Sequence, residues 1–435
     1  MKTATNHKSP HGAFTLIKLE KDFFEYEHKK NGLRVIYHYI PDTGVVTSNI
    51  VYKVGSKHEL PGQTGLAHML EHMVFKPTKS DLEKKLGQSS IMELERNTGA
   101  VINASTWKDR TNYYCTAATS FLSQILSIHA DQMQNVVITD KNLAPEQTTV
   151  LSEYDMYNSD PHFALEATVS ATAFSAHPYR HETIGWRSDI EQYTAQKLND
   201  FYKLHYIPNN AVIILVGDVS TKEALTAIDM AFGKIPKGSL PKSLNLSEPP
   251  QEGGRRTSIT RPTTTNLLTI SAKGPAFGTK EWVTTLVLLK ILADGPDSLL
   301  HRALVDTGKL TNVGYVLYPT AESFLTSITC TLANNNDHDA IEKTILKIIS
   351  ELKAPELTKP LKKTVAQICY AEPFSRDSSG SIASELTEYI TTEDWTQWCK
   401  TEELVKEVTI KELLAVKDSL FTTNTLTIGT FIGTN

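Results

Sequence analysis

The sequence predicts two consecutive domains, each built from both β-strands and α-helices. The chain has 435 residues, which exceeds the size at which a single hydrophobic core usually stops growing. A stretch rich in Pro and Gly, residues 236–254, separates two halves with a similar alternation of strand and helix patterns. We therefore expect a flexible N-terminal lead over 1–20, a first domain over 21–235, a linker over 236–255 and a second domain over 256–435.

Composition excludes several classes of protein. Hydrophobic residues make up 40% and charged residues 21% of the chain, as in ordinary globular proteins. A net charge of -5 argues against a nucleic-acid binder, and the 4 scattered cysteines form no C-x-x-C pair, so they indicate neither a zinc ribbon nor a disulfide scaffold. No apolar run is long enough for a membrane span. The polar first ten residues lack the apolar core of a signal peptide, which favours a cytoplasmic protein, or a periplasmic one if a leader was removed.

The first half begins with strand patterns. Asn31-Gly32 is a hairpin turn signal between two strand-like segments, and a buried strand is expected after it. The strands are expected at 24–27, 33–39, 45–55, 101–107, 112–116 and 211–218, and helices at 65–75, 90–96, 121–135, 143–155 and 198–206. Pro145 is expected at the start of its helix, where its missing N–H costs nothing.

The second half repeats this order of strand and helix. Strands are expected within 257–273, within 312–331 and at 425–432, and helices at 279–306, 338–353, 379–391 and 409–419. We interpret this half as a diverged copy of the first.

The most informative segment is His68-Met69-Leu70-Glu71-His72, which lies in the helix expected at 65–75. On a helix, His68 and His72 stand one above the other at positions i and i+4. Two neutral imidazoles on one face can bind a single Zn²⁺ ion. Glu71 lies beside that face and could reach a metal-bound water without being a ligand, which is the H-x-x-E-H pattern. A His pair at this spacing is also common on ordinary helices, so the interpretation needs further ligands.

A third ligand is expected from the helix at 143–155. Catalytic zinc is usually held by three protein ligands, and Glu153 is the best candidate. Glu146 lies seven residues earlier on the same face and is expected to hydrogen-bond a ligand or the reaction water. The alternative is a solvated carboxylate face. His177 and His181 are also four residues apart, but Pro178 between them disfavours a helical pair, and we interpret both as structural.

The strand expected at 101–107 follows the histidine-bearing helix. Asn103 and Ser105 on this strand are polar, as expected of a strand with an open edge. Peptides commonly bind by adding a strand to such an edge. The alternative is an interior strand with polar ends.

Together these motifs resemble the pitrilysin-type (M16) zinc metallopeptidases, which include insulin-degrading enzyme, the mitochondrial processing peptidases and the zinc-binding subunits of two-subunit bacterial members. The resemblance rests on His68-Met69-Leu70-Glu71-His72 with Phe75, Asn103-Ala104-Ser105-Thr106, Glu146, Glu153, His177-Pro178-Tyr179, Tyr206-Ile207-Pro208-Asn209-Asn210 and Gly217-Asp218. It covers most of residues 25–235. It implies an α+β fold of two similar domains, each a mixed β-sheet covered by helices, as in the M16 and LuxS-like metallohydrolases.

The resemblance also implies a function and a set of roles. It implies a zinc-dependent endopeptidase that hydrolyses extended or unfolded peptides and binds one Zn²⁺ per chain. The implied metal ligands are His68, His72 and Glu153, the implied catalytic residues are Glu71 as general base and Glu146 as supporting carboxylate, and the implied substrate-binding residues are Asn103, Ala104, Ser105 and Phe75.

One departure from the family pattern concerns the second half. Single-chain and homodimeric members carry an Arg and, seven residues later, a Tyr in their metal-free half, where this chain has Val305 and Asn312. Arg302 and Tyr315 lie nearby but out of register. We therefore expect the zinc-bearing subunit of a hetero-oligomer whose homologous partner lacks the zinc motif, with a homodimer as the alternative.

Two other functions compete with this interpretation. The first is a non-catalytic assembly subunit that has kept the fold. The second is an oxygen-activating enzyme, because non-haem iron is also held by two His and one carboxylate. The metal content of the purified protein separates zinc, iron and no metal.

Overall fold

The computed structural model describes residues 11–240, 246–333, 337–392 and 394–434. It groups the chain into two compact units that are not contiguous in sequence. The first unit takes the chain up to Ser152, the stretch from Glu182 to the linker, and Ser375–Cys399. The second takes Glu153–His181, the stretch from the linker to Phe374, and Lys400 to the C-terminus.

The expected domains, 21–235 and 256–435, therefore differ from the observed units at two segments. Residues 153–181 group with the second unit and residues 375–399 with the first. The reason is apolar packing that local sequence patterns do not reveal. Leu165 and Val169 pack with Leu267 and Phe431, and residues 382–399 contribute to a core cluster of the first unit. The expected linker carries no helix or strand over 236–240 and 246–254, while 241–245 lies outside the described residues.

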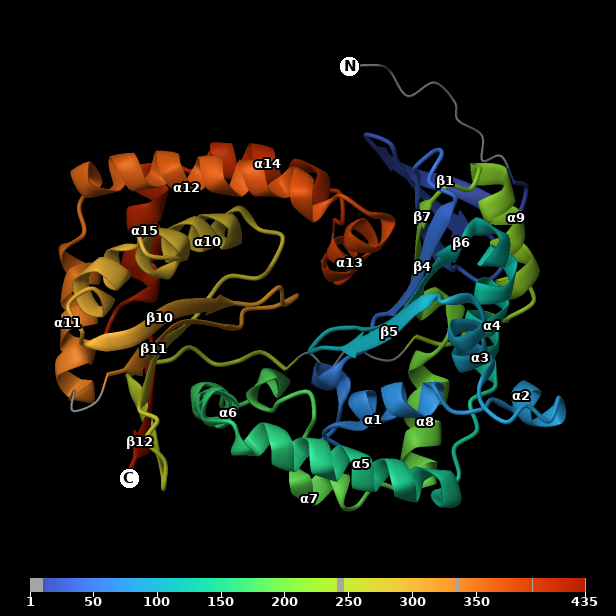
Figure 1. The fold of residues 1–435 in the computed structure, drawn as a ribbon, viewed down its shortest axis with the longest axis horizontal. Helices are drawn as coiled ribbons and strands as arrows, with labels where there is room; N and C mark the ends of the chain where they lie inside the picture. Colours follow the sequence, from blue (N-terminus) through green and yellow to red (C-terminus); the bar gives the residue numbers. More distant parts are fainter. Residues whose placement is uncertain (1–10, 241–245, 334–336, 393, 435) are drawn as a thin grey trace. The chain divides into compact units, whose positions relative to one another are not determined.

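The first unit is built on a seven-stranded mixed sheet with the order β1-β2-β3-β7-β4-β6-β5 (Figure 1). Its strands are β1 (Phe14–Glu20), β2 (Phe23–His28), β3 (Arg34–Tyr39), β4 (Val45–Tyr52), β5 (Val101–Thr106), β6 (Thr111–Ala118) and β7 (Ala211–Gly217). Only the β3 and β7 pair is parallel. The central strands are rich in Val and Ile because both of their faces are buried. Strand β5 lies at an edge, so one side of its backbone has no strand beside it.

The N-terminal lead expected over 1–20 is wrong over its last part. Residues Phe14–Glu20 form β1, which pairs antiparallel with β2. Phe14 is 1% exposed and packs edge-on against the ring of His28. Burial of this aromatic ring fixes the strand. Residues 1–10 lie outside the described residues.

Helices cover both faces of this sheet. On one face α4 packs against β4 and β6, and on the other α13 packs against β4 and β7 (Figure 1). The α-helices of this unit are α1 (Leu66–Val74), α2 (Lys79–Glu83), α3 (Ser90–Thr98), α4 (Leu122–Gln134), most of α5 (Asp140–Ser159), α7 (Arg187–Ile190), α8 (Ala195–His205), α9 (Thr221–Phe232) and α13 (Ser379–Tyr389). Short 3₁₀ turns lie at Ser56–His58, Thr119–Phe121 and Pro208–Asn210.

Helix α5 begins earlier than the sequence predicted. It starts at Asp140, so Pro145 lies inside it rather than at its first residue. Pro lacks an N–H and so leaves one backbone carbonyl of the preceding turn without its usual partner. That carbonyl lies in the first turn of the helix, and Leu143 and Val150 are buried, so packing of α5 outweighs the loss.

The second unit contains a five-stranded mixed sheet with the order β10-β11-β9-β12-β8, in which β8 and β12 pair in parallel. Its strands are β8 (Arg255–Arg261), β9 (Leu267–Lys273), β10 (Leu310–Leu317), β11 (Leu325–Leu332) and β12 (Leu426–Gly433). Its α-helices are α6 (Pro161–Ala173), α10 (Lys280–Ala293), α11 (His338–Glu351), α12 (Ala354–Ser375), α14 (Gln397–Lys406) and α15 (Ile410–Leu420), with a 3₁₀ turn at Pro178–Arg180. Both units are thus mixed sheets covered by helices, which confirms the expected α+β fold.

The long helix expected at 279–306 is wrong. Helix α10 ends at Ala293. The segment Asp294-Gly295-Pro296 is not helical, and a π-helical turn, η5, follows at His301–Val305. Gly295 has a φ of 74°, which a residue with a side chain rarely adopts. Gly and Pro together stop a helix despite continuous apolar periodicity on both sides.

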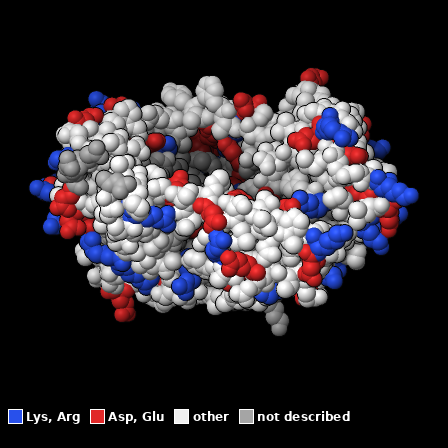
Figure 2. All heavy atoms as spheres, turned by 60° about the horizontal axis from the view of Figure 1, so that its bottom comes forward, with Lys and Arg blue, Asp and Glu red and all other residues white. Residues whose placement is uncertain are grey.

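Charged side chains are mixed on the molecular surface. Figure 2 shows Lys and Arg interspersed with Asp and Glu over the visible face, in keeping with the net charge of -5. Within the parts of the chain that the structure describes, no helix is both long and apolar enough to cross a membrane.

Candidate metal centre and peptide-binding edge

Helix α1 presents the H-x-x-E-H residues on its less buried face. The opposite face is fully buried and contributes Leu66, Ala67, Met69, Leu70, Met73 and Val74 to the core. His68, Glu71 and His72 are partly exposed. This division follows from the helical repeat, because apolar and polar residues alternate with a period near 3.6.

The N-terminus of α1 is held by a buried carboxylate. Glu59 accepts hydrogen bonds from the backbone N–H groups of Gly65, at 2.7 Å, and Ala67, at 2.8 Å. These are N–H groups that the first turn of a helix leaves without partners. Burial raises the pKa of Glu59 well above its usual value, whereas the two backbone hydrogen bonds and the charge of Lys108 lower it. The contacts fix where α1 begins and hence where His68 lies.

Gly65 is required at this helix start by its backbone angle and by its neighbours. Its φ is 88°, and an added Cβ would lie 2.3 Å from the carbonyl oxygen of Ile184 and 2.3 Å from the hydroxyl of Tyr193. We expect Gly65→Ala to lower the free energy of unfolding by about 2–4 kcal/mol, because strain and a backbone clash add. Urea unfolding measures this. Gly62→Ala is the matched control: Gly62 has a φ of 80° but nothing within 4 Å of an added Cβ, so its cost should be about 1 kcal/mol. Equal costs for the two variants would contradict the role of the clash.

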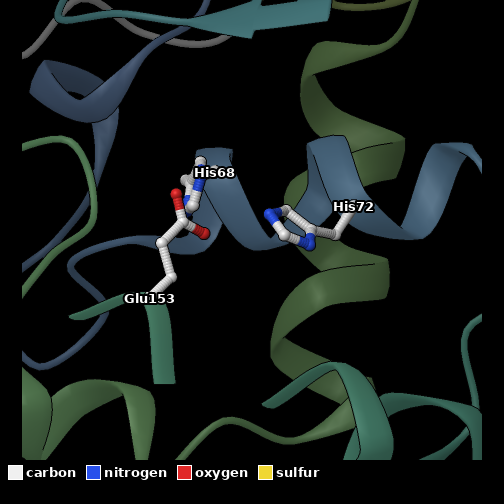
Figure 3. Close-up of side chains that lie close together, drawn as sticks. All are labelled: His68, His72 and Glu153. Atoms are coloured by element: carbon white, nitrogen blue, oxygen red, sulfur yellow. The ribbon is translucent and has the colours of Figure 1, made fainter. Parts of the chain in front are cut away.

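Three potential metal ligands come together at α1 and α5. The ligand atoms of His68, His72 and Glu153 all lie within 4.8 Å of one another, and Figure 3 shows their side chains directed toward a common point. The boundary between the two units falls inside α5, directly before Glu153, and the helix is continuous across it. Two imidazoles and one carboxylate are the donor set of a catalytic zinc site. Among the residues that the structure describes, this is the one such group found.

Glu146 lies two helical turns before Glu153 and beside His72. Its Oε2 is 3.6 Å from Nδ1 of His72, and its Oε1 is 2.5 Å from Nζ of Lys76. A carboxylate beside a ligating imidazole orients the ring and increases its basicity. Glu146 thus lies beside His72, where a supporting carboxylate is predicted, and its role stays a prediction. Lys76 was not expected to take part.

Glu71 is linked to the edge strand. The hydroxyl of Thr106 on β5 donates a hydrogen bond to Oε2 of Glu71 at 2.5 Å. The sequence assigns no function to Thr106, the last residue of the Asn103-Ala104-Ser105-Thr106 motif. Alternation along β5 places it on the same face as Ala104, which is the signal that could have identified it. The β5–β6 hairpin is itself fixed, because Ser56 donates a backbone hydrogen bond to Trp107 at 3.0 Å and Lys57 to Lys108 at 2.9 Å.

The other expected substrate-binding residues lie on or near β5. The side chain of Asn103 accepts from the backbone N–H of Ala104 at 2.8 Å, and both positions are at the sheet edge. Ser105 is directed to the opposite face from Thr106, where its hydroxyl accepts from Nη1 of Arg110 at 2.9 Å. Phe75 is partly buried and packs against the cluster around Ile91 and Leu94, so much of its surface is used by the core.

Two tyrosines lie close to Glu71. The hydroxyls of Tyr113 and Tyr206 are hydrogen-bonded at 2.8 Å. Burial raises the pKa of both phenols well above the usual value, and the charge of Glu71 adds to this. Both phenols therefore remain neutral at ordinary pH and add no charge near Glu71.

His177 and His181 lie outside the metal centre. His177 accepts from the N–H of Tyr179 through Nδ1 at 3.2 Å, and its Nε2 is 3.1 Å from a carboxylate oxygen of Glu322. Both histidines are buried. Their hydrogen bonds and burial agree with a structural role.

The fold is that of a family of peptidases. The family description "Insulinase (Peptidase family M16)" matches residues 34–186, and "Peptidase M16 inactive domain" matches residues 192–361. The chain belongs to the M16 peptidase family. The second description fits a half in which the described residues hold no metal group of their own.

Known proteins are similar to this chain over 61% to 96% of its length. "Zinc protease PqqE" of Helicobacter pylori is 27% identical over 403 residues, which is 90% of this chain and 89% of that protein. A "Probable mitochondrial-processing peptidase subunit beta" of Schizosaccharomyces pombe is 27% identical over 61% of this chain and 58% of its own length. A crystal structure of a protease from Helicobacter pylori superposes with a TM-score of 0.87 and 25% identity, and covers 96% of this chain and 99% of that one.

Proposed function

We propose that this protein is a zinc-dependent endopeptidase that hydrolyses extended or unfolded peptides. The observation that carries the proposal is the convergence of His68, His72 and Glu153, with all ligand atoms within 4.8 Å of one another, beside a glutamate bound to an edge strand. The donor set fits zinc, and we expect one ion per chain because one such group is found among the described residues. The names of similar proteins, several of them zinc proteases, support this activity.

The chemistry divides between the metal and Glu71. When bound, zinc lowers the pKa of a water and polarises a carbonyl. Glu71 is placed to accept the proton of that water and to pass it to the leaving amine, as a general base and then a general acid. The hydroxyl of Thr106 on β5 donates a hydrogen bond to Oε2 of Glu71. This bond fixes the orientation of the carboxylate relative to the strand.

The substrate backbone is proposed to pair with β5. Trp107 donates to the carbonyl of Arg110 at 2.8 Å, and the antiparallel ladder alternates from that pair. By this alternation residues 102, 104 and 106 direct their N–H and C=O groups to the open edge. A peptide bound there is recognised mainly through its backbone, so extended peptides are the expected substrates. The side chain of Asn103 would have to release the N–H of Ala104 on binding.

We further propose that the active enzyme is a hetero-oligomer. Val305 and Asn312 occupy the positions where an Arg and a Tyr are expected in self-sufficient members. The out-of-register candidates are engaged within their own unit: Arg302 pairs with Asp297 at 2.9 Å, and Nζ of Lys290 lies 5.8 Å from the ring of Tyr315. A partner subunit of the same fold, without the zinc motif, would supply the missing donors. A homodimer is the alternative.

The test is hydrolysis of unfolded, fluorogenic peptides by the zinc-loaded chain, alone and with a purified homologous subunit that carries the Arg and Tyr. We expect a rise of about a hundredfold or more with the partner, the effect of one oxyanion donor. Full activity of the isolated chain would contradict the hetero-oligomer. Metal analysis on the same samples tests the alternatives: no bound metal supports an assembly subunit, and stoichiometric iron supports an oxygen-activating enzyme.

A further inference from the structure

A cavity of about 710 Å³ lies within the first unit, between α13 and the sheet. Its sheet side includes Thr47 of β4, Thr116 of β6, and Val101 and Ser105 of the edge strand β5. The paired residues of these three strands share one face of the sheet. Thr106, which binds Glu71, points to the other face. The cavity therefore adjoins β5 on the face away from the metal centre.

The cavity exists because α13 presents small side chains to this part of the sheet. Ser379, Gly380, Ser381, Ala383 and Ser384 line it from the helix. Folded interiors are normally packed without voids of this size. Glu388, the large side chain of α13 in the lining, is held by its ion pair with Arg110, and the small side chains of the first turns leave the rest of the space open.

The same helix is anchored firmly along its other side. Ile382, Leu386 and Ile390 pack in a core cluster with Trp395 and Trp398. Large apolar side chains therefore hold α13 in place, and small ones leave the gap. The cavity does not depend on a loosely attached helix.

The polar groups on the floor of the cavity are already hydrogen-bonded to one another. The hydroxyl of Thr47 lies 2.8 Å from that of Thr116 and 2.9 Å from that of Ser379. The amide of Asn49 donates to the hydroxyl of Thr387 at 2.6 Å, and the amide of Asn112 donates to Asn49 at 3.0 Å. These bonds connect strands and helix across the cavity floor, so its shape is preformed.

The cavity is continuous with the edge where the substrate is proposed to bind. Val101 is 59% exposed and lines the cavity, as does Ser105 four residues later. Four residues of a strand span about 13 Å. A peptide added to β5 would direct alternate side chains to this face, and two or three of them would pass along the cavity.

Of the three charged residues that line the cavity, Arg110 and Glu388 form an ion pair, and Asp377 is exposed to solvent. Arg110 forms a short ion pair with Glu388 and also donates to Asn112 at 2.9 Å and to the carbonyl of Ser105 at 3.1 Å. Asp377 is exposed and accepts from the hydroxyl of Ser381 at 3.3 Å. Among the described lining residues, the buried charge of Arg110 is already neutralised by Glu388 and the remaining charge, Asp377, is exposed, so burying an incoming charge inside the cavity would be costly. Hydroxyls and amides can instead exchange hydrogen bonds with a neutral polar group.

We propose that this cavity receives substrate side chains that face away from the metal, and that it prefers uncharged polar ones such as Gln, Asn or Thr. The inference rests on the proposed function and adds side-chain selectivity to it. Recognition through the β5 backbone alone would not depend on the amino-acid sequence of the peptide. The cavity makes binding depend on the side chains at alternate positions of the peptide.

The test fills the cavity from α13. A Cβ added to Gly380 would lie 3.8 Å from Oγ1 of Thr116 and 3.9 Å from Oγ of Ser378, which is ordinary contact, so Gly380→Leu directs its side chain into the space. Gly12→Leu is the matched control, because Gly12 is exposed and nothing lies within 4 Å of its added Cβ. Thermal unfolding of both variants checks that they fold.

The substrates are peptides that are identical except for Gln, Ala, Glu or Lys at alternate positions. The parent protein, with the partner subunit if it needs one, should cleave the Gln peptide with a kcat/KM about tenfold or more above the others, the scale on which pocket contacts discriminate. Gly380→Leu should remove this preference, so that kcat/KM for the Gln peptide falls to the value for the Ala peptide in the same variant, and Gly12→Leu should keep it. No preference in the parent, or a preference that persists in Gly380→Leu, would overturn the cavity assignment.

Binding separates this inference from the proposed activity. Fluorescence anisotropy of labelled Gln and Ala peptides on Glu71→Gln, with and without Gly380→Leu, reports the cavity without turnover. Preferential binding of the Gln peptide that is lost in Gly380→Leu supports the cavity even if hydrolysis fails. Cleavage of all peptides at equal rates supports the peptidase and rejects the cavity.

Discussion

Glu71→Gln is expected to lower the rate of peptide hydrolysis by about 100- to 10,000-fold, the range for loss of a general base, and to leave the zinc content unchanged. The amide has the shape of the carboxylate and can still accept the hydrogen bond from Thr106, which is 2.5 Å long in the structure. It cannot accept a proton. Single-turnover hydrolysis and metal analysis of the same sample measure the two effects.

A matched control for Glu71→Gln is Glu83→Gln. The Glu83 side chain is 70% exposed on α2 and lies 4.0 Å from Lys79, so its contribution to stability and activity should be small. Turnover by Glu71→Gln at a rate near that of the parent would remove Glu71 from the role of base. Loss of zinc together with activity would place Glu71 among the ligands instead.

Glu153→Ala is expected to abolish stoichiometric zinc binding and all hydrolysis, because two imidazoles alone do not complete a catalytic zinc site. Glu146→Gln should retain zinc with an affinity about 10- to 100-fold weaker, as for other residues that support a ligand. It also weakens the contact with Lys76, now 2.5 Å. Titration of zinc into the metal-free variants measures both affinities.

The control for these variants is Ser152→Ala. Ser152 is exposed next to Glu153 and bonds only within α5, to the carbonyl of Thr148 at 2.9 Å. Zinc affinity should not change in this variant. If Glu146→Gln lost zinc completely while Glu153→Ala kept it, the roles assigned to the two carboxylates would be reversed.

Local patterns account for much of the grouping of His68, His72 and Glu153 that the structure shows. The spacing of His68 and His72 fixes their common face once the segment is helical, because the geometry of a helix is the same in every protein. The same rule relates Glu146 to Glu153, two turns apart on α5. The candidate third ligand, Glu153, lies 81 residues after the second histidine, since 153 − 72 = 81; the need for a third donor and the helix at 143–155 suggested it, and the resemblance to a family implies the same residue.

Local patterns failed where burial or helix-breaking residues decided the outcome. Phe14 appeared to belong to a flexible lead and is 1% exposed in a strand. Pro145 appeared to begin a helix and lies inside one. The apolar periodicity of 279–306 continued across Gly295 and Pro296, and the helix did not. For Phe14 and Pro145 the deciding interaction is packing against other parts of the fold, whereas for 279–306 the deciding residues, Gly295 and Pro296, lie within the segment and outweigh its apolar periodicity.

The sequence by itself determined the candidate groups of this site: two imidazoles and a carboxylate on one helix, two carboxylates on another, and an edge strand with polar residues. Only the tertiary structure decided which groups complete that site. Thr106 on Glu71, Glu59 at the start of α1, and the contribution of α13 to the first unit all join residues far apart in the chain. The physical reason is that helix and strand periodicities constrain near neighbours, whereas packing and buried hydrogen bonds select among distant ones.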